Sequence, residues 1–245
     1  MKIDINCDMG EGIGNDTAIM PFISSANIAC GYHAGDEETM RRTIELCLQY
    51  NVAIGAHPSF SDKKNFGRTE MHLSTSEVYE LVTKQIRLFD EIVKQCGASL
   101  HHVKPHGALY NMSAKDSQLA TAIALAVKNM DEKLILYGLS GSYSINEANV
   151  IGLKTAHEVF ADRTYQDDGS LTPRLKAKAL IEDVNTMSKQ VLQMIKDKTV
   201  TSLSGKTISI LADTICIHGD GKHAVEFAKT IHHVLKQNNI DIKAI

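Results

Sequence analysis

Proton-transferring and charged side chains recur in this sequence directly after short apolar segments. They are Asp8 and Glu11, His33, His57, Lys104 and His106, Glu158, and His218 and Asp220. Histidine exchanges protons near neutral pH, carboxylates accept them, and lysine stabilises negative charge that develops during a reaction. The set therefore indicates acid–base catalysis.

The apolar segments that precede these side chains read as β-strands. They alternate with longer segments whose apolar residues recur every three or four positions, as in amphipathic helices. The predicted strands are 2–7, 26–30, 52–56, 100–104, 133–137, 152–156 and 214–217. Strands joined by helices form a mainly parallel sheet, whose ligand site lies at the carboxyl ends of the strands. We therefore expect the polar side chains to meet in one mouth.

Side chains alternate along a strand, which places several of these residues on common faces. The sets are Asp4, Asn6 and Asp8, then Lys104 and His106, then His218 and Asp220. A single histidine at a strand end often only bonds to a loop, and Asp8 could be a turn residue. The same pattern at six strand ends exceeds what turns require, so it favours a catalytic site.

Local signals outside the strands predict three further features. Ser74 and Glu77 form a capping box at the start of a helix, and Gly97 lies at that helix's carboxyl end. Thr172-Pro173 predicts the start of a long helix that ends near residue 198. Residues 200–211 predict a β-hairpin inserted before the last strand.

Three arginines could hold an anionic group of a ligand. Arg163 and Arg174 flank a turn, and Arg68 follows the loop at 61–67. A guanidinium binds carboxylate or phosphate through two parallel hydrogen bonds. Surface arginines paired with nearby acids are the alternative for each of them.

Composition narrows the class of protein. The chain has 245 residues and a net charge of −3, which excludes a strongly basic nucleic-acid binder. Its five cysteines show no C-x-x-C spacing, and its longest apolar stretch, 119–127, is too short to cross a membrane. The glycines at 10, 12 and 14 lack the dinucleotide-binding spacing. We expect one domain over 1–245, in the cytoplasm.

Seven strings together resemble the LamB/YcsF family of 5-oxoprolinase A subunits. They are NCDMGEG (6–12), NIACGYHAGD (27–36), GAHPS (55–59), FGR (66–68), VKPHGALYN (103–111), FADR (160–163) and DTICIHGD (213–220). The resemblance implies a (β/α)7 barrel of the glycoside hydrolase/deacetylase type. It also implies that 5-oxoproline is opened to L-glutamate with ATP hydrolysis, together with two partner subunits similar to carboxyltransferase or allophanate hydrolase halves.

This reaction suggests roles for the strand-end residues. A lactam is a poor electrophile, so ATP would phosphorylate its oxygen before water attacks. Asp8 and His106 would transfer protons, with His57 and His218 in reserve, while Lys104 with Arg68 or Arg163 would hold phosphate or carboxylate. The residues that would bind or orient the substrate are Asn6, Glu11, His33, Arg68, Glu158, Asp162, Arg163, Arg174 and Asp220.

Three other interpretations stay open. Asp8, His33, His57 and His106 are ligand types that could bind a divalent metal, although their spacing forms no short metal motif. The chain could then be a stand-alone, metal-dependent carbohydrate or amide deacetylase that needs no ATP. It could also be a non-catalytic subunit that binds the lactam for a partner.

Overall fold

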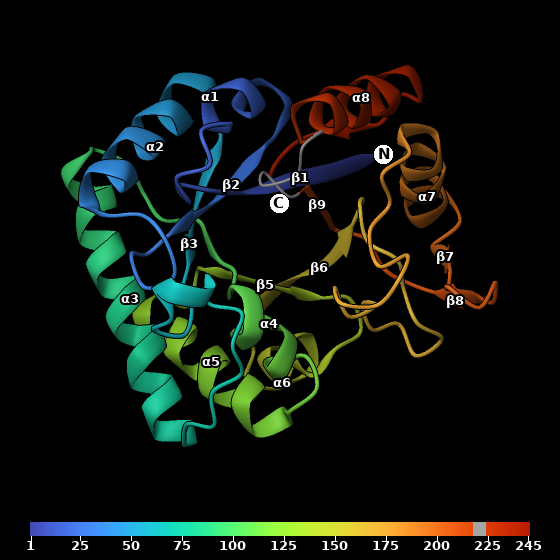
Figure 1. Cartoon of the computed structure of the whole chain (residues 1–245). Coiled ribbons are helices and arrows are strands. Elements are labelled where there is room, and N and C mark those ends of the chain that lie inside the picture. The colour runs from blue at the N-terminus through green and yellow to red at the C-terminus, as the bar shows by residue number, and fades with distance from the viewer. Residues whose placement is uncertain (218–223) are drawn as a thin grey trace.

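Parallel strands close into a barrel in this computed structural model, which describes residues 1–217 and 224–245. The seven barrel strands among these residues are β1 (Lys2–Met9), β2 (Ser25–Ala29), β3 (Ala53–His57), β4 (His102–Val103), β5 (Ile135–Leu139), β6 (Lys154–Phe160) and β9 (Thr214–Ile217). Their order around the barrel follows the chain (Figure 1). The predicted (β/α)7 barrel is confirmed.

The ring closes between the first and the last barrel strand. β1 pairs with β9 in parallel, with Asp4 opposite Thr214 and Asn6 opposite Cys216. β9 pairs on its other side with β6. A short strand, β10 (Asp241–Ile242), pairs with the amino-terminal end of β1. β1 therefore contacts three strands and holds the barrel together.

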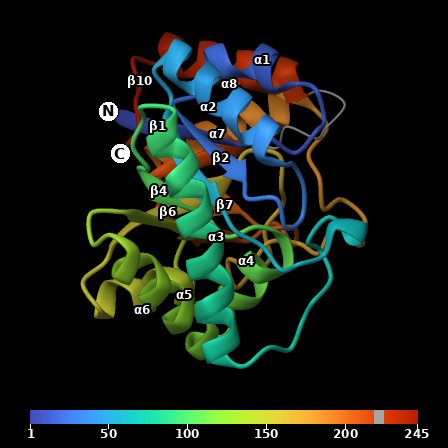
Figure 2. The ribbon, with the colours of Figure 1, turned by 90° about the vertical axis from the view of Figure 1, so that its left-hand side faces the viewer.

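Helices surround the barrel (Figures 1 and 2), and their apolar residues are buried in the core. The longer ones are α2 (Glu37–Tyr50), α3 (Thr75–Gln95), α5 (Ser117–Met130), α6 (Tyr143–Val150), α7 (Val184–Lys196) and α8 (Ala224–Gln237). The short ones are α1 (Asp16–Ile19), η1 (Met20–Phe22), η2 (Lys63–Asn65) and α4 (Gly107–Ser113). Among the described residues, none of the helices combines the length and hydropathy that a bilayer crossing requires.

The predicted ends of α3 are confirmed, but the start of α7 is not. Ser74 and Glu77 form the capping box, and Gly97 follows α3 with φ +73°. The helix predicted from Thr172 begins only at Val184, because Asp183 accepts a hydrogen bond from the Thr186 N–H and caps it there. Residues 173–183 form a loop instead.

The predicted hairpin is present before the last barrel strand. β7 (Thr199–Thr201) and β8 (Thr207–Ser209) pair antiparallel, with Thr201 opposite Thr207. The hairpin forms a separate two-stranded sheet outside the barrel. It follows α7 and leads the chain back to β9.

A polar cluster centred on Asp4 lies inside the barrel, at the end where β2 and β9 begin. The buried Asp4 carboxylate accepts hydrogen bonds from the hydroxyls of Ser24 (2.5 Å), Ser25 (2.8 Å), Tyr137 (3.0 Å) and Thr214 (2.6 Å). Burial raises the pKa of Asp4, although these hydrogen bonds oppose the shift. The cluster ties together β1, β5, β9 and the β2 region.

Candidate active site

A cavity of about 530 Å³ opens where the strands end, and it suits a small molecule. Its lining includes Asp8, Glu11, His57, Lys104 and His106. The same lining includes four further cationic side chains and an apolar surface. The cations are Arg68, Lys115, Arg163 and Arg174, and the main apolar residues are Tyr110, Phe160, Leu171 and Leu175.

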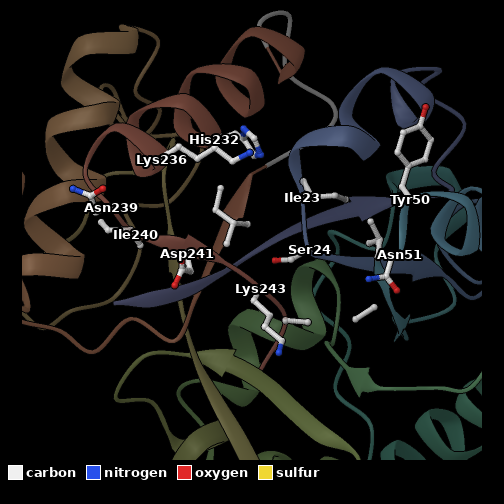
Figure 3. A pocket seen from close by; sticks show the side chains of 14 residues that line it. Ile23, Ser24, Tyr50, Asn51, His232, Lys236, Asn239, Ile240, Asp241 and Lys243 are labelled. Carbon is white, nitrogen blue, oxygen red and sulfur yellow. The ribbon is translucent and has the colours of Figure 1, made fainter.

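A second cavity, of about 750 Å³, lies away from this mouth. Figure 3 shows its walls, which come from the residues just before β2, the turn before β3, α8 and the segment that follows α8. Ser24, Asn51, His232, Lys236 and Asp241 are among its lining residues. None of the predicted site residues in the described part of the chain lines it, so the first cavity is the candidate site.

His57 and His106 meet through ring nitrogens that both carry lone pairs. His57, the last residue of β3, donates its Nδ1–H to the Lys104 carbonyl at 2.7 Å. His106, the N-cap residue of α4, donates its Nε2–H to the Phe66 carbonyl at 2.9 Å. These acceptors assign the tautomers of the neutral rings. The remaining nitrogens, His57 Nε2 and His106 Nδ1, lie 2.9 Å apart.

The His33 ring is also oriented by a hydrogen bond from one of its nitrogens. Ser59 Oγ donates to the Phe60 carbonyl, so it accepts the Nδ1–H of His33 at 2.9 Å. This leaves His33 Nε2 with a lone pair 3.1 Å from Glu11 Oε1. The His33 ring stacks on His106, with 3.8 Å between the centroids.

Four acceptor atoms therefore converge from Glu11, His33, His57 and His106, all within 4.8 Å of one another. Burial, followed by the neighbouring His57, lowers the pKa of His106 to about 3. Burial likewise lowers the pKa of His33. Acceptors that face one another require a proton or a metal cation between them. Ring nitrogens oriented by outer hydrogen bonds are typical of metal ligands, so these residues could hold a divalent ion.

Gly67 lets the 61–68 loop close against these histidines. Its φ is +64°, and a Cβ there would lie 2.9 Å from His33 Cβ and 3.0 Å from His106 Cδ2. The Gly67 carbonyl also accepts a hydrogen bond from the Ala108 N–H. The loop thereby places the Phe66 carbonyl that fixes His106.

Lys104 lies beneath the histidines as the centre of an ion-pair group. Its Nζ is 2.9 Å from Asp8 Oδ1 and 2.8 Å from Glu158 Oε1, and it donates to Asn6 Oδ1 at 3.3 Å. Burial alone would lower the pKa of Lys104, but Asp8 and its other neighbours raise it well above the usual value. The ammonium is therefore a fixed positive charge. Asp8 also lies 3.3 Å from His57 Nε2.

The other predicted residues lie at different depths. Asn6 and Glu158 are buried below the mouth and are not among the described lining residues, whereas Arg68, Arg163 and Arg174 line it. Asp162 follows β6 and is half-buried. Two predicted residues, His218 and Asp220, lie outside the described residues.

Sequence reasoning missed several residues that shape the site. Ser59 and Phe66 orient His33 and His106, and Tyr110 and Phe160 form part of the apolar wall. Glu11 was expected to orient substrate, yet the structure brings its carboxylate among the three histidines. The glycines on either side of Glu11, with φ of +69° and +79°, were the available signal for this tight loop.

Comparison with known proteins gives close matches over the whole chain. The model of the LamB/YcsF family matches residues 3–245. The 5-oxoprolinase A subunit of Tolumonas auensis is 51% identical over 249 residues, covering 100% of this chain and 99% of that protein. The corresponding protein of Geobacillus kaustophilus is 52% identical over 246 residues, covering 99% and 96%.

One solved structure matches the entire fold. The crystal structure of the lactam utilization protein from Thermus thermophilus superposes with a TM-score of 0.94 at 40% identity. The match covers 100% of both chains. The barrel and its helices are therefore shared with that protein.

Proposed function

The chain belongs to the LamB/YcsF family, and from this we propose that it is the A subunit of an ATP-dependent 5-oxoprolinase. The reaction opens the lactam ring of 5-oxo-L-proline to give L-glutamate. Relatives that are about half identical to this chain are named as A subunits of 5-oxoprolinase, which supports the assignment. The name implies other subunits. We propose that two partner subunits carry out the ATP-dependent activation. We also propose that the complex works in the cytoplasm.

The facing nitrogens of His57 and His106 carry the catalytic part of the proposal. Opening a lactam requires a group that takes a proton from water and a group that gives one to the ring nitrogen. A single proton between the two nitrogens, 2.9 Å apart, replaces lone-pair repulsion with an N–H···N hydrogen bond. The pair can therefore accept one proton and return it, and the Asp8 carboxylate beside His57 stabilises the charged form.

Cationic side chains near the His57–His106 pair would stabilise the negative charges that the rest of the reaction involves. Phosphorylation of the lactam oxygen makes the ring carbon a better electrophile. Water then adds to that carbon, the ring C–N bond breaks as the nitrogen takes up a proton, and a second water hydrolyses the resulting acyl phosphate to glutamate and inorganic phosphate. The phosphoryl group carries negative charge throughout. The fixed ammonium of Lys104 orients Asp8 and offsets that charge. Arg68, Arg163 and Arg174 are available for the anionic groups of the substrate.

A glutamate-release assay tests this proposal. The chain is assayed alone and with both partner subunits, with and without ATP. Glutamate should form only when all three subunits and ATP are present. If Asp8→Asn and His106→Gln variants with native circular dichroism spectra keep the wild-type rate, the chain binds lactam without catalysing its opening.

The cluster of Glu11 with three histidines favours one alternative, a metal-dependent amide or carbohydrate deacetylase. Its four ligand atoms fit a divalent ion such as Zn²⁺, which would lower the pKa of a bound water. Such an enzyme would hydrolyse its substrate without ATP or partners. Activity of the isolated chain that is lost with a chelator and restored by metal would favour this alternative over 5-oxoprolinase.

A further inference from the structure

Arg163 is a buried cation whose guanidinium makes few hydrogen bonds and ion pairs within the protein. It follows β6, is only 5% exposed and lines the mouth. Its guanidinium makes one hydrogen bond, from Nη2 to the Thr172 carbonyl at 2.5 Å, and its Nε has no partner among the described residues. The neighbouring Asp162 carboxylate favours the charged form of Arg163, but none of the ion pairs within 4.0 Å among residues 1–217 and 224–245 involves Arg163. Burying an unpaired charge is unfavourable, so an anionic ligand is the expected partner.

The backbone around Arg163 is fixed independently of any ligand. Gln190 of α7 donates its Nε2–H to the Arg163 carbonyl at 2.9 Å, and Arg163 forms an antiparallel bridge with Leu180. Thr172, which accepts the guanidinium hydrogen bond, is held by its own N–H bonded to the Thr164 carbonyl. The guanidinium is therefore positioned before a ligand arrives.

Charges are distributed unequally around the mouth. Arg174 and Lys115 line the same mouth, and Arg174 is close enough to Arg163 to lower the pKa of Arg163 further after the effect of burial. Asp8 and Glu11 contribute carboxylates to the part that carries the histidines. A small molecule with one anionic end and one uncharged polar end is therefore oriented, with its anionic end toward Arg163.

We propose that Arg163 binds the carboxylate of the substrate and so selects lactams that carry a carboxylate over lactams that lack one. This inference rests on the proposed lactam-opening function and adds the feature that defines the substrate class. The guanidinium has five N–H groups, and those left over from Thr172 can bind carboxylate oxygens. The apolar side chains of Tyr110 and Phe160 would contact the ring.

Binding measurements on the complex test this selection without requiring turnover. Isothermal titration calorimetry compares L-5-oxoproline with 2-pyrrolidinone, which has the same ring without the carboxylate. Wild type should bind 5-oxoproline about 10- to 100-fold more tightly, the range expected for a charged hydrogen-bonded pair. Arg163→Gln should abolish that preference and leave 2-pyrrolidinone binding unchanged. Arg87→Gln, an exposed arginine on α3, is the matched control and should keep the preference.

Each outcome separates this inference from the proposed function. Equal wild-type binding of the two lactams would overturn the role of Arg163 but leave lactam opening intact. Binding of neither lactam would overturn the proposed function itself. Inorganic phosphate is titrated in parallel, and Arg163-dependent phosphate binding without effect on 5-oxoproline would assign Arg163 to the phosphate instead. If Arg163→Gln does not fold, wild type titrated with 5-oxoprolinamide tests the same ligand charge.

Discussion

His57 Nε2 and His106 Nδ1 lie 2.9 Å apart, although each ring has already donated its other N–H to a backbone carbonyl. This contact is favourable only when one proton or one cation lies between the two nitrogens. Both uses require both rings, so neither histidine can be replaced without loss of the shared position.

His106→Gln should therefore lower ATP-dependent glutamate formation by about 10²- to 10⁴-fold, the usual contribution of a positioned acid–base group. Stopped assays of the complete complex at saturating 5-oxoproline measure this effect on the turnover rate. His72→Gln, in an exposed loop, serves as the control and should retain the wild-type rate. A loss confined to the Michaelis constant would argue for a binding role of His106.

Under the alternative, metal-dependent function, the cluster of Glu11, His33, His57 and His106 should bind one divalent transition-metal ion per chain. Chelator-treated protein titrated with Zn²⁺ and analysed by native mass spectrometry gives the stoichiometry. His33→Ala should weaken binding at least about 10-fold, because it removes one ligand with its outer hydrogen bond to Ser59. Unchanged binding in this variant would place the ion elsewhere.

Lys104 should contribute strongly to stability, because it lies between the buried Glu158 carboxylate and the half-buried Asp8 carboxylate. Lys104→Met removes the positive charge that both carboxylates face and should lower the free energy of unfolding by about 3–5 kcal/mol. The Glu158→Gln substitution removes one of the two carboxylate charges. A double-mutant cycle by urea denaturation should give a coupling energy of about 1–3 kcal/mol, whereas additive effects would contradict the ion pair.

Asp4 should make stability fall as pH rises, opposite to the usual carboxylate. Its pKa in the folded protein is raised above 3.8, so the unfolded chain loses this proton first. Its favourable contribution is complete below pH 3.8 and is lost as pH rises through the folded pKa. The melting temperature of Asp4→Asn, relative to wild type, should therefore increase with pH above 3.8. A difference that does not change with pH would contradict the raised pKa.

The strands and the shared mouth were predictable from sequence because their signals are local. Polar residues at the end of an apolar strand must face the ligand edge of a parallel barrel, as His57 and Lys104 do. The alternation of Asp4, Asn6 and Asp8 likewise predicted that they share one face of the first strand, and Asp4 and Asp8 do contact side chains that come from other strands, Tyr137 and Lys104.

The remaining features depend on contacts that are distant in sequence. The burial of Arg163 follows from its bridge to Leu180 and its bond from Gln190. The segment before α7 stays a loop, against the local helix signal at Thr172, because it bonds to the chain after β6, as in the hydrogen bond from the Ile181 N–H to the Asp162 carbonyl. Local patterns carry no information about either contact.

Pairing of β1 with β9 has a consequence for how the chain acquires its shape during synthesis. β1 cannot pair with β9 until Thr214, the partner of Asp4, has been synthesised. Most of the polypeptide is therefore made before these two strands can pair. Contacts between such distant segments slow folding. Until β9 is available, β1 also has an edge of unpaired backbone N–H and C=O groups in the growing chain. Closure of the barrel should therefore be a late step of folding, and chaperones that shield strand edges should raise the yield of folded protein.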